Sequence, residues 1–92
     1  MITLDLNKLG YDAFAFIFIK IANKSEVTEI YNQLLKIPNL LEIIRHIGIY
    51  DMRVLVPVAD IKDVFNLKEH IRKIKGIELA EISLHEIIFP WQ

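Results

Sequence analysis

The chain has 92 residues, which supports one hydrophobic core and not two, because a domain of this size buries only about 60% of the surface that its unfolded chain exposes. Its 53% hydrophobic content is more than so small a domain can hide, which indicates that another subunit covers part of it. The 11 Lys and Arg against 12 Asp and Glu exclude a strong basic field for a nucleic-acid backbone, and the absence of cysteine excludes disulfides and thiolate zinc sites.

A strand and a helix are predicted at the beginning of the chain. The segment from Asp12 to Ile21 reads DAFAFIFIKI, and its density of Phe and Ile over a short run favours a strand. Ser25 then makes a good N-cap for a helix, which Pro38 prevents from continuing. The apolar stripe of this helix consists of Val27, Ile30, Tyr31 and Leu34.

The middle of the chain is predicted to form two strands joined by a tight connection. Leu40 to Ile47 is a second apolar segment, Gly48 to Asp51 is the connection, and Met52 to Val56 is the third strand. Pro57 has no backbone N–H and is expected to end that strand.

A second helix and a fourth strand follow. Asp60 is the predicted N-cap of the helix, and Gly76 is expected to stop it. Its apolar stripe consists of Val64, Leu67, Ile71 and Ile74, and basic residues at its negative end are Arg72, Lys73 and Lys75. The last strand runs from Ile77 to about Ile88, and Phe89 to Gln92 form a tail.

The element order is therefore β-α-β-β-α-β, the split-βαβ or ferredoxin-like pattern of an α+β domain. In this topology the antiparallel strands take the order 4-1-3-2, so that the first and third strands lie in the middle. Two right-handed crossovers put both helices on one face of the sheet, which leaves the opposite face bare in a monomer.

Both sides of the first strand are apolar, so either of them could lie on the bare face. Successive side chains point to opposite sides, which puts Phe14, Phe16 and Phe18 on one side and Ile17 on the other. A bare face of either composition is typical of an interface, and the four residues of the tail are too few to cover it. We therefore expect sheet-on-sheet dimerisation, with these four strand residues as interface candidates.

No catalytic, metal or cofactor site is predicted. His46 and His85 fall on strands at opposite edges of the sheet, and His70 falls on the second helix, so the three rings are not expected to converge on a metal. They are interpreted as surface or interface histidines. The chain also has no nucleophile motif and no glycine-rich phosphate loop.

The tetrapeptide Gly48-Ile49-Tyr50-Asp51 is the most specific segment in the chain. It is typical of a hairpin turn, in which Gly supplies an unusual φ and Asp accepts backbone N–H bonds. It is equally typical of an anion nest, in which several backbone N–H groups together hold a carboxylate. The spacing alone leaves both interpretations open.

Four segments together resemble the C-terminal domain of Lrp/AsnC regulators: Leu9 to Asp12, Ile37-Pro38, Gly48 to Met52, and Gly76-Ile77. The resemblance covers essentially the whole chain. It implies a ferredoxin-like domain that pairs through its sheet as a dimeric α-β barrel, often assembles as four dimers, and binds an amino acid between dimers. It also implies that Gly48, Ile49, Tyr50 and Asp51 hold the effector, with Asp51 as the candidate for its ammonium group.

The chain departs from this family in two ways. The helix-turn-helix that reads DNA in the family is not in this sequence, so residues 1–92 are interpreted as a single ligand-binding and oligomerisation domain, either excised or stand-alone. DNA contact is then expected only through such a helix-turn-helix. The fourth strand has Ala80 and Ile82 where hydroxyl residues are frequent in the family. These two positions are expected to line the pocket and to favour an apolar amino acid, or no effector.

The leading hypothesis is an effector-sensing and oligomerisation domain of a transcription regulator, and not an enzyme. A small dimeric α+β-barrel enzyme is one alternative, since fold alone does not decide function, and it would need a cavity lined by His46 or His85. A purely structural assembly module is another. The longest apolar run, Ala13 to Ile19, falls short of the about 20 residues that span a bilayer, and no cationic leader precedes it, so a cytoplasmic protein without membrane contact is expected.

Overall fold

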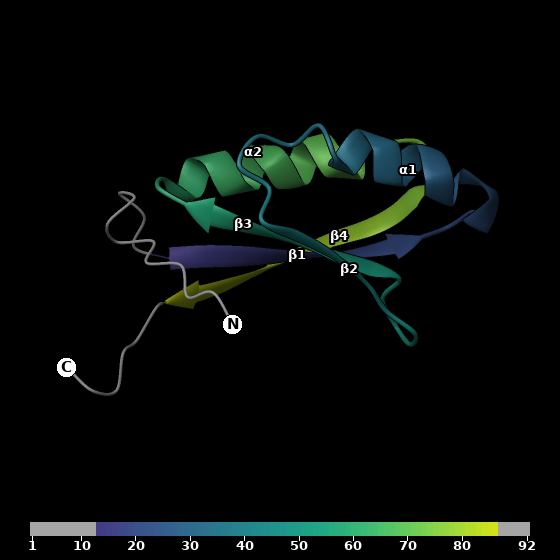
Figure 1. Ribbon diagram of the computed structural model, residues 1–92, viewed down its shortest axis with the longest axis horizontal. Helices are drawn as coiled ribbons and strands as arrows, with labels where there is room; N and C mark the ends of the chain where they lie inside the picture. The colour runs from purple at the N-terminus through teal and green to yellow at the C-terminus, as the bar shows by residue number, and fades with distance from the viewer. Residues whose placement is uncertain (1–12, 87–92) are drawn as a thin grey trace.

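The computed structural model describes residues 13–86, which form one antiparallel sheet and two α-helices (Figure 1). The elements are β1 Ala13–Ile21, the 3-10 helix η1 Lys24–Glu26, α1 Val27–Leu34, β2 Glu42–Arg45, β3 Met52–Val58, α2 Ile61–Arg72 and β4 Ile77–Glu86. The strand order is β2-β3-β1-β4, and both helices lie on the same face of the sheet (Figure 1). The predicted α+β ferredoxin-like fold and its 4-1-3-2 strand order are confirmed.

The hydrophobic core lies between the helices and one face of the two central strands. Along β1, Ala15, Ile17 and Ile19 are fully buried, and they pack with the helix residues Ile30 and Ile71. Val54 of β3 and Ile82 of β4 flank Ile17 in the same row of the sheet. The core also contains Ile21, Leu34, Ile37, Met52, Val56, Val58, Val64 and Ala80. Because burial alternates along β1 and β3, the odd side chains of β1 face the helices, and its phenylalanines face away from them.

The cap of the first helical segment is Asn23, and the prediction of Ser25 was wrong by two residues. The Asn23 side chain accepts from the Ser25 backbone N–H at 3.0 Å and from its hydroxyl at 2.7 Å, and the chain enters a 3-10 turn before α1 begins. The amide side chain reaches a backbone donor two residues ahead, which is the usual geometry of an Asx cap. Asp60 caps α2 as predicted, since its carboxylate accepts from the Lys62 backbone N–H at 2.9 Å.

Pro57 does not end β3, and this prediction was also wrong. The strand continues to Val58, with Pro57 opposite Phe14 of β1. The carbonyl of Leu55 accepts from Leu41, on the β2 side of the strand, and Pro57 is two residues further on, so its nitrogen faces that same side. Strand β2 pairs only as far as Leu55, so no ladder bond is lost where the proline lacks a donor.

The turn after α2 needs a glycine for two reasons. Gly76 has a φ of +94°, and a Cβ placed on it would lie 2.7 Å from Cβ of Glu26. Its carbonyl accepts from the Ala22 backbone N–H at 2.8 Å, which ties the end of β1 to the start of β4. Within residues 13–86, neither helix has the length and the apolar content that crossing a bilayer requires.

Candidate functional site

The hairpin between β2 and β3 projects from the sheet on the side away from the helices (Figure 1). It is closed by a bond of 2.8 Å from the His46 backbone N–H to the carbonyl of Asp51. Gly48 at its tip has a φ of +144° with nothing within 4 Å of an added Cβ, so the glycine is needed for backbone conformation and not for close packing. Ile47 and Ile49 are 107% and 79% exposed, respectively. The hairpin therefore offers two aliphatic side chains and free backbone to a ligand or another subunit.

Asp51 fixes this hairpin to the end of β1. One carboxylate oxygen accepts from the Ile21 backbone N–H at 2.7 Å, and the other accepts from the ammonium of Lys24. The backbone N–H of Asp51 in turn donates to the carbonyl of Ile19 at 2.9 Å. The bond from Ile21 and the contact with Lys24 hold the pKa of the Asp51 carboxyl below its usual value. Both oxygens are thus engaged within the chain, one of them with a lysine that is itself mostly exposed.

Tyr50 connects the hairpin to β4 across the face of the sheet that no helix covers within residues 13–86, here called the uncovered face. Its ring centroid lies 5.2 Å from that of Phe18, and its hydroxyl donates to a carboxylate oxygen of Glu81 at 2.5 Å. This hydrogen bond, and the negative charge of Glu81, raise the pKa of the Tyr50 hydroxyl, because both favour the protonated phenol. Glu81 is therefore a neighbour of the hairpin that the sequence analysis missed.

Ala80 and Ile82 do not meet the hairpin within one chain. Ala80 is 2% exposed and lies opposite Ile19, and Ile82 lies opposite Ile17, so both face the helices and belong to the core or its margin. Strand alternation puts the residue between them, Glu81, on the other face together with Tyr50. The structure thus brings Gly48, Ile49, Tyr50 and Asp51 together and leaves the two apolar β4 residues on the opposite side of the sheet.

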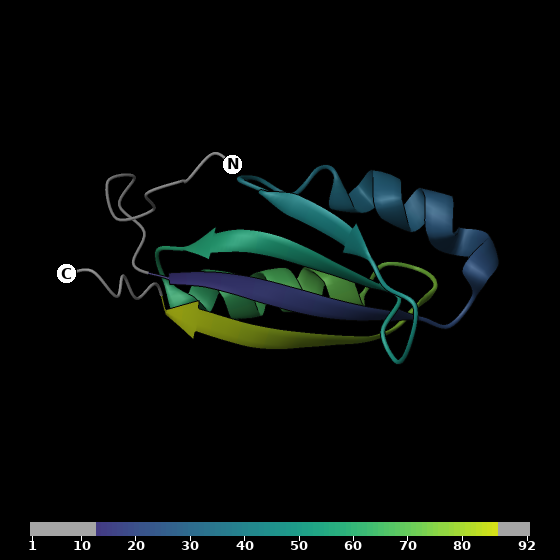
Figure 2. The same ribbon diagram turned by 60° about the horizontal axis from the view of Figure 1, so that its bottom comes forward.

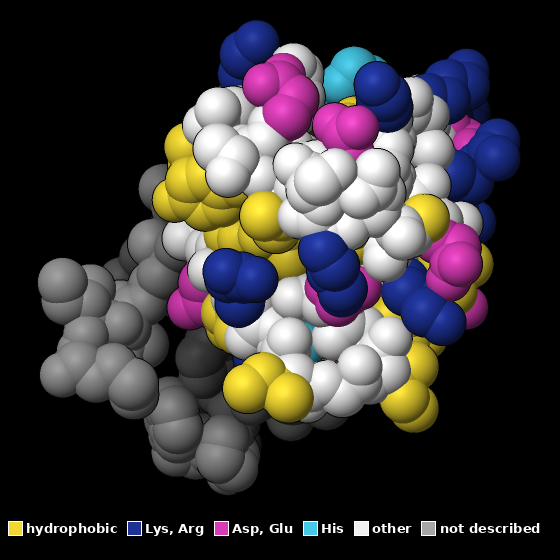
Figure 3. Space-filling view, turned by 90° about the vertical axis from the view of Figure 1, so that its right-hand side faces the viewer, with side chains coloured by type: hydrophobic (Ala, Val, Ile, Leu, Met, Phe, Trp, Pro, Cys, Tyr) yellow, Lys and Arg dark blue, Asp and Glu magenta, His cyan; other side chains and the backbone are white. Residues whose placement is uncertain are grey.

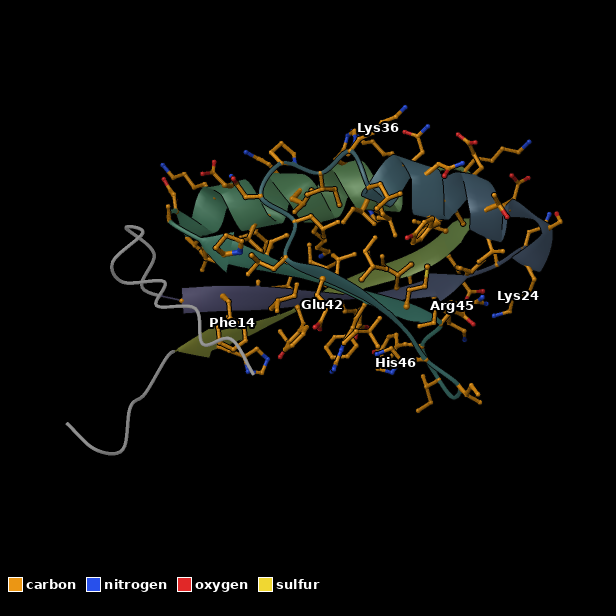
Figure 4. The ribbon with its side chains drawn as sticks, in the orientation of Figure 1. Phe14, Lys24, Lys36, Glu42, Arg45 and His46 are labelled. Carbon is orange, nitrogen blue, oxygen red and sulfur yellow. The ribbon has the colours of Figure 1, made fainter. Side chains whose placement is uncertain are left out.

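The face without helices carries a row of aromatic side chains on β1. Phe14 points away from the helices in Figure 4, and its ring lies 5.8 Å from that of Phe16, which lies 6.2 Å from that of Phe18. The ring of His85 stacks on Phe14 at 5.2 Å with an interplanar angle of 8°. Ile17 lies on the other side of β1 with 0% exposure, so it is removed from the interface candidates, and the three phenylalanines remain.

Polar groups lie among these rings. The guanidinium carbon of Arg53 is 4.4 Å from the centroid of the Phe16 ring, and the His46 ring is 6.1 Å from that of Phe18. In the part of the chain that the structure describes, Arg53 Nε and His46 Nε2 are the buried side-chain nitrogens and oxygens that have no hydrogen-bond partner. The uncovered face is thus aromatic at its centre and retains unused hydrogen-bonding capacity.

The three histidines do not form a metal site in residues 13–86. His46 and His85 lie near opposite edges of the uncovered face, His70 is exposed on α2, and the described residues contain no cluster of three or more His, Asp or Glu that could hold an ion. A hollow of about 340 Å³ opens between α2, the end of β3 and the loop before β2. Its lining is mostly aliphatic, with Asn39 and Asp63 as polar members, and includes neither His46 nor His85.

Charges of both signs alternate at the hairpin end of the molecule. Figure 3 shows Lys and Arg interspersed with Asp and Glu on this side. Lys20 pairs with Glu78 at 3.3 Å, and Lys75 pairs with Glu26 at 3.6 Å. Within each pair the two opposite charges offset one another, so the described residues on this side present no extended basic surface for a phosphate backbone.

Sequence comparisons identify relatives among transcription regulators. No protein-family model matches the chain. It is 34% identical over 83 residues to an uncharacterised HTH-type transcriptional regulator of Pyrococcus abyssi, a match that covers 87% of this chain and 55% of the relative. It is 31% identical over 70 residues to the HTH-type transcriptional regulator FL11 of Pyrococcus furiosus, over 76% of this chain and 46% of that one. The chain therefore spans about half the length of these relatives.

Solved structures share the fold. AsnC of E. coli matches with a TM-score of 0.80 at 21% identity, over 98% of this chain and 60% of that chain. The protein FFRP-DM1 matches with a TM-score of 0.68 at 29% identity, over 78% of this chain and 96% of that one. A feast or famine regulatory protein from M. tuberculosis, complexed with L-methionine, matches with a TM-score of 0.77 at 18% identity, over 97% and 60% of the two chains.

Proposed function

Because the chain is a domain of the Lrp/AsnC family of transcription regulators, we propose that it self-associates through the uncovered face of its sheet and senses an amino acid at the β2–β3 hairpin. In this proposal the chain binds an effector and assembles, and a separate helix-turn-helix domain, the type for which the relatives are named, binds the DNA. The near-neutral charge of the chain supports a separate DNA-binding domain, since DNA affinity depends on phosphate neutralisation.

The observation that carries the proposal is the row of Phe14, Phe16 and Phe18 on a central strand, on the face opposite the helices. A contiguous apolar patch of this kind marks an interaction surface in a protein that stays in solution. A second copy is the natural occupant, because an isologous pair buries the same patch on both subunits at once. A closed pair of sheets is the dimeric α-β barrel, and four such pairs would give the larger assembly that the family resemblance implies.

A matched pair of charge insertions tests the self-association. Phe16→Lys puts an ammonium at the centre of the proposed interface, and Phe65→Lys makes the same change at a Phe that is 50% exposed on α2. Sedimentation should find Phe16→Lys monomeric and Phe65→Lys assembled like the unaltered chain. If both variants assemble equally well, the uncovered face is not the interface.

The hairpin is the proposed effector site. A ligand carboxylate would lie against the backbone N–H groups of Gly48, Ile49 and Tyr50, because a carboxylate that leaves water needs several donors and the N–H of Asp51 already donates to Ile19. The ammonium of the ligand would replace the exposed ammonium of Lys24 on the outer oxygen of Asp51. Ile47 and Ile49 provide exposed aliphatic surface for the ligand's side chain, which supports a preference for Leu, Ile, Val, Met or Phe. The L-methionine complex of the M. tuberculosis protein, which shares the fold, is consistent with this class.

Calorimetry against a panel of amino acids tests this site. An apolar amino acid should bind to the unaltered chain, and Asp51→Ala should weaken that binding by about 1.5–3 kcal/mol, the usual contribution of a hydrogen bond to a charged group. Lys24→Ala is the informative companion, since it removes the internal competitor for Asp51 and should leave binding equal or stronger. A preference for Asn or Gln, or equal affinity in Asp51→Ala, would argue against this pocket.

A purely structural assembly module is the second candidate function. The engagement of both Asp51 oxygens by Ile21 and Lys24 favours it, since a side chain that already serves the fold needs no ligand. Absence of heat with every amino acid, in a chain that still assembles, would select this candidate.

A further inference from the structure

Arg53 and His46 each leave a nitrogen without a hydrogen bond on the uncovered face. Within residues 13–86, Arg53 Nε, a donor, and His46 Nε2 are buried without a hydrogen-bond partner, and the guanidinium of Arg53 packs against the Phe16 ring at 4.4 Å. When another surface covers this face, water is removed from it, and the cost of an unpaired charged donor rises. Whatever covers the face must therefore present an acceptor to Arg53.

The acceptor is available on the same face, on the other side of β1. Phe18 lies opposite Arg53 of β3 and opposite Glu81 of β4, so the cation and the carboxylate occupy one row and flank the same aromatic residue. Two strand spacings, about 10 Å in total, separate their backbones. Glu81 uses one oxygen for the Tyr50 hydroxyl, and a carboxylate has room for further donors.

The row has a symmetry that a second copy can use. A two-fold axis along β1, between two sheets packed face to face, exchanges the β3 side of one subunit with the β4 side of the other. It brings Arg53 over Glu81 of the partner subunit and, by the same operation, Glu81 over the partner subunit's Arg53. An axis across the strands at Phe18 would instead bring the two Arg53 side chains together, and like charges in a covered interface are strongly disfavoured.

We infer that reciprocal pairs between Arg53 and Glu81 of the partner subunit fix the register of the sheet-to-sheet dimer and select a like copy as partner, an inference that rests on the self-association proposed above. The phenylalanines supply the buried apolar area, and apolar contact alone would allow the two sheets to slide past each other. The charges are paired in only one relative position of the two sheets. Arg53 and Glu81 are therefore specificity-determining residues of the interface.

Complementation in trans tests this directly. Arg53→Glu gives two acidic positions facing each other across the interface, and Glu81→Arg gives two basic ones, so each variant alone should show a dimer dissociation constant at least about thirtyfold higher. In an equimolar mixture of the two variants every facing pair is again of opposite charge. Native mass spectrometry should then find the mixed dimer, with a dissociation constant within about tenfold of the unaltered one.

Two controls separate this from other effects. Tyr50→Phe removes the intrachain bond to Glu81 and should leave the dimer intact, and the charge reversals Arg72→Glu and Glu69→Arg on α2 should not change the assembly. The double variant with both interface charges reversed should dimerise with itself, which guards against loss of fold in a single variant. Circular dichroism checks that each variant is folded.

The outcomes are distinct from those that test the proposed function. If the unaltered chain dimerises and Phe16→Lys abolishes the dimer, but Arg53→Glu and Glu81→Arg dimerise normally or fail to rescue each other, the charge pairing is overturned and self-association through the sheet stands. If the unaltered chain is a monomer, both the charge pairing and the proposed self-association are contradicted.

Discussion

Asp51 shows how one side chain can belong to both the fold and the candidate site. Its carboxylate holds the backbone N–H of Ile21 at 2.7 Å and contacts Lys24, and its pKa is lowered by these partners. The pKa of this carboxyl is lower in the folded chain than in the unfolded chain, where it is about 3.9. The carboxylate therefore stabilises the folded chain at pH values above the unfolded pKa, and this stabilisation is lost as the pH falls through the folded pKa. The hairpin is thus anchored by a bond that acid weakens.

Replacement of Asp51 should lower stability at neutral pH. Asp51→Ala leaves the Ile21 N–H without its acceptor and is expected to lower the free energy of unfolding by about 1–3 kcal/mol. Between pH 7 and pH 3 the unaltered chain should lose more stability than Asp51→Asn. Urea denaturation at fixed protein concentration measures both, with Asp63→Asn on α2 as the control for an exposed acid. An Asp51→Asn variant with the same pH dependence as the unaltered chain would contradict this role.

Tyr50 provides a second test at this scale. Its pKa is raised because the hydroxyl donates to Glu81 and lies near that negative charge. Glu81→Ala removes both causes, so the ring resonances of Tyr50 should titrate at lower pH than in the unaltered chain. An unchanged NMR titration would mean that the contact between Tyr50 and Glu81 does not persist in solution.

At the scale of elements, the two glycines in turns differ in what they are needed for. Both have positive φ, but an added Cβ would meet nothing at Gly48 and would lie 2.7 Å from Glu26 at Gly76. Gly48→Ala should therefore cost only the backbone strain, about 1–3 kcal/mol, and Gly76→Ala should cost more because a clash is added. Thermal unfolding of both variants measures the difference. Equal losses would show that the backbone at Gly76 relaxes away from Glu26.

The element order could be predicted from the sequence because apolar periodicity and capping residues are local signals. The limits of β2 and β3 could not be predicted, since they depend on how far the two strands pair. Pairing with β2 ends at Leu55, and for this reason Pro57 can lie within β3. The assignment of faces was ambiguous for a related reason. Both sides of β1 are apolar, and the decision comes from its neighbours, where Arg53 and Glu81 lie opposite Phe18. With the strand register known, these charges would have identified the uncovered side and would have separated Glu81 from Ala80 and Ile82.

At the scale of the whole molecule, the charge balance bears on nucleic acid. The 11 basic and 12 acidic residues give a net charge of −1, and several of the described lysines are paired with acids. We expect no measurable DNA binding by this chain at physiological salt, because non-specific affinity comes from phosphate neutralisation. A gel-shift assay checks this. Binding that weakens steeply with added salt would reveal a basic surface outside the described residues or formed on assembly.

The uncovered face also explains the excess of apolar residues for so short a chain. The helices cover one side of the sheet (Figure 2). The other side carries the phenylalanines of β1, with Arg53 and Glu81 flanking Phe18. The proposed self-association therefore depends on a second copy that covers this face.

The mass of the unaltered chain in solution tests that dependence most directly. Multi-angle light scattering at micromolar concentration should give at least twice the 10.8 kDa of a single chain, with a mass that falls only on strong dilution. A uniform species of 10.8 kDa at that concentration would contradict self-association through this face.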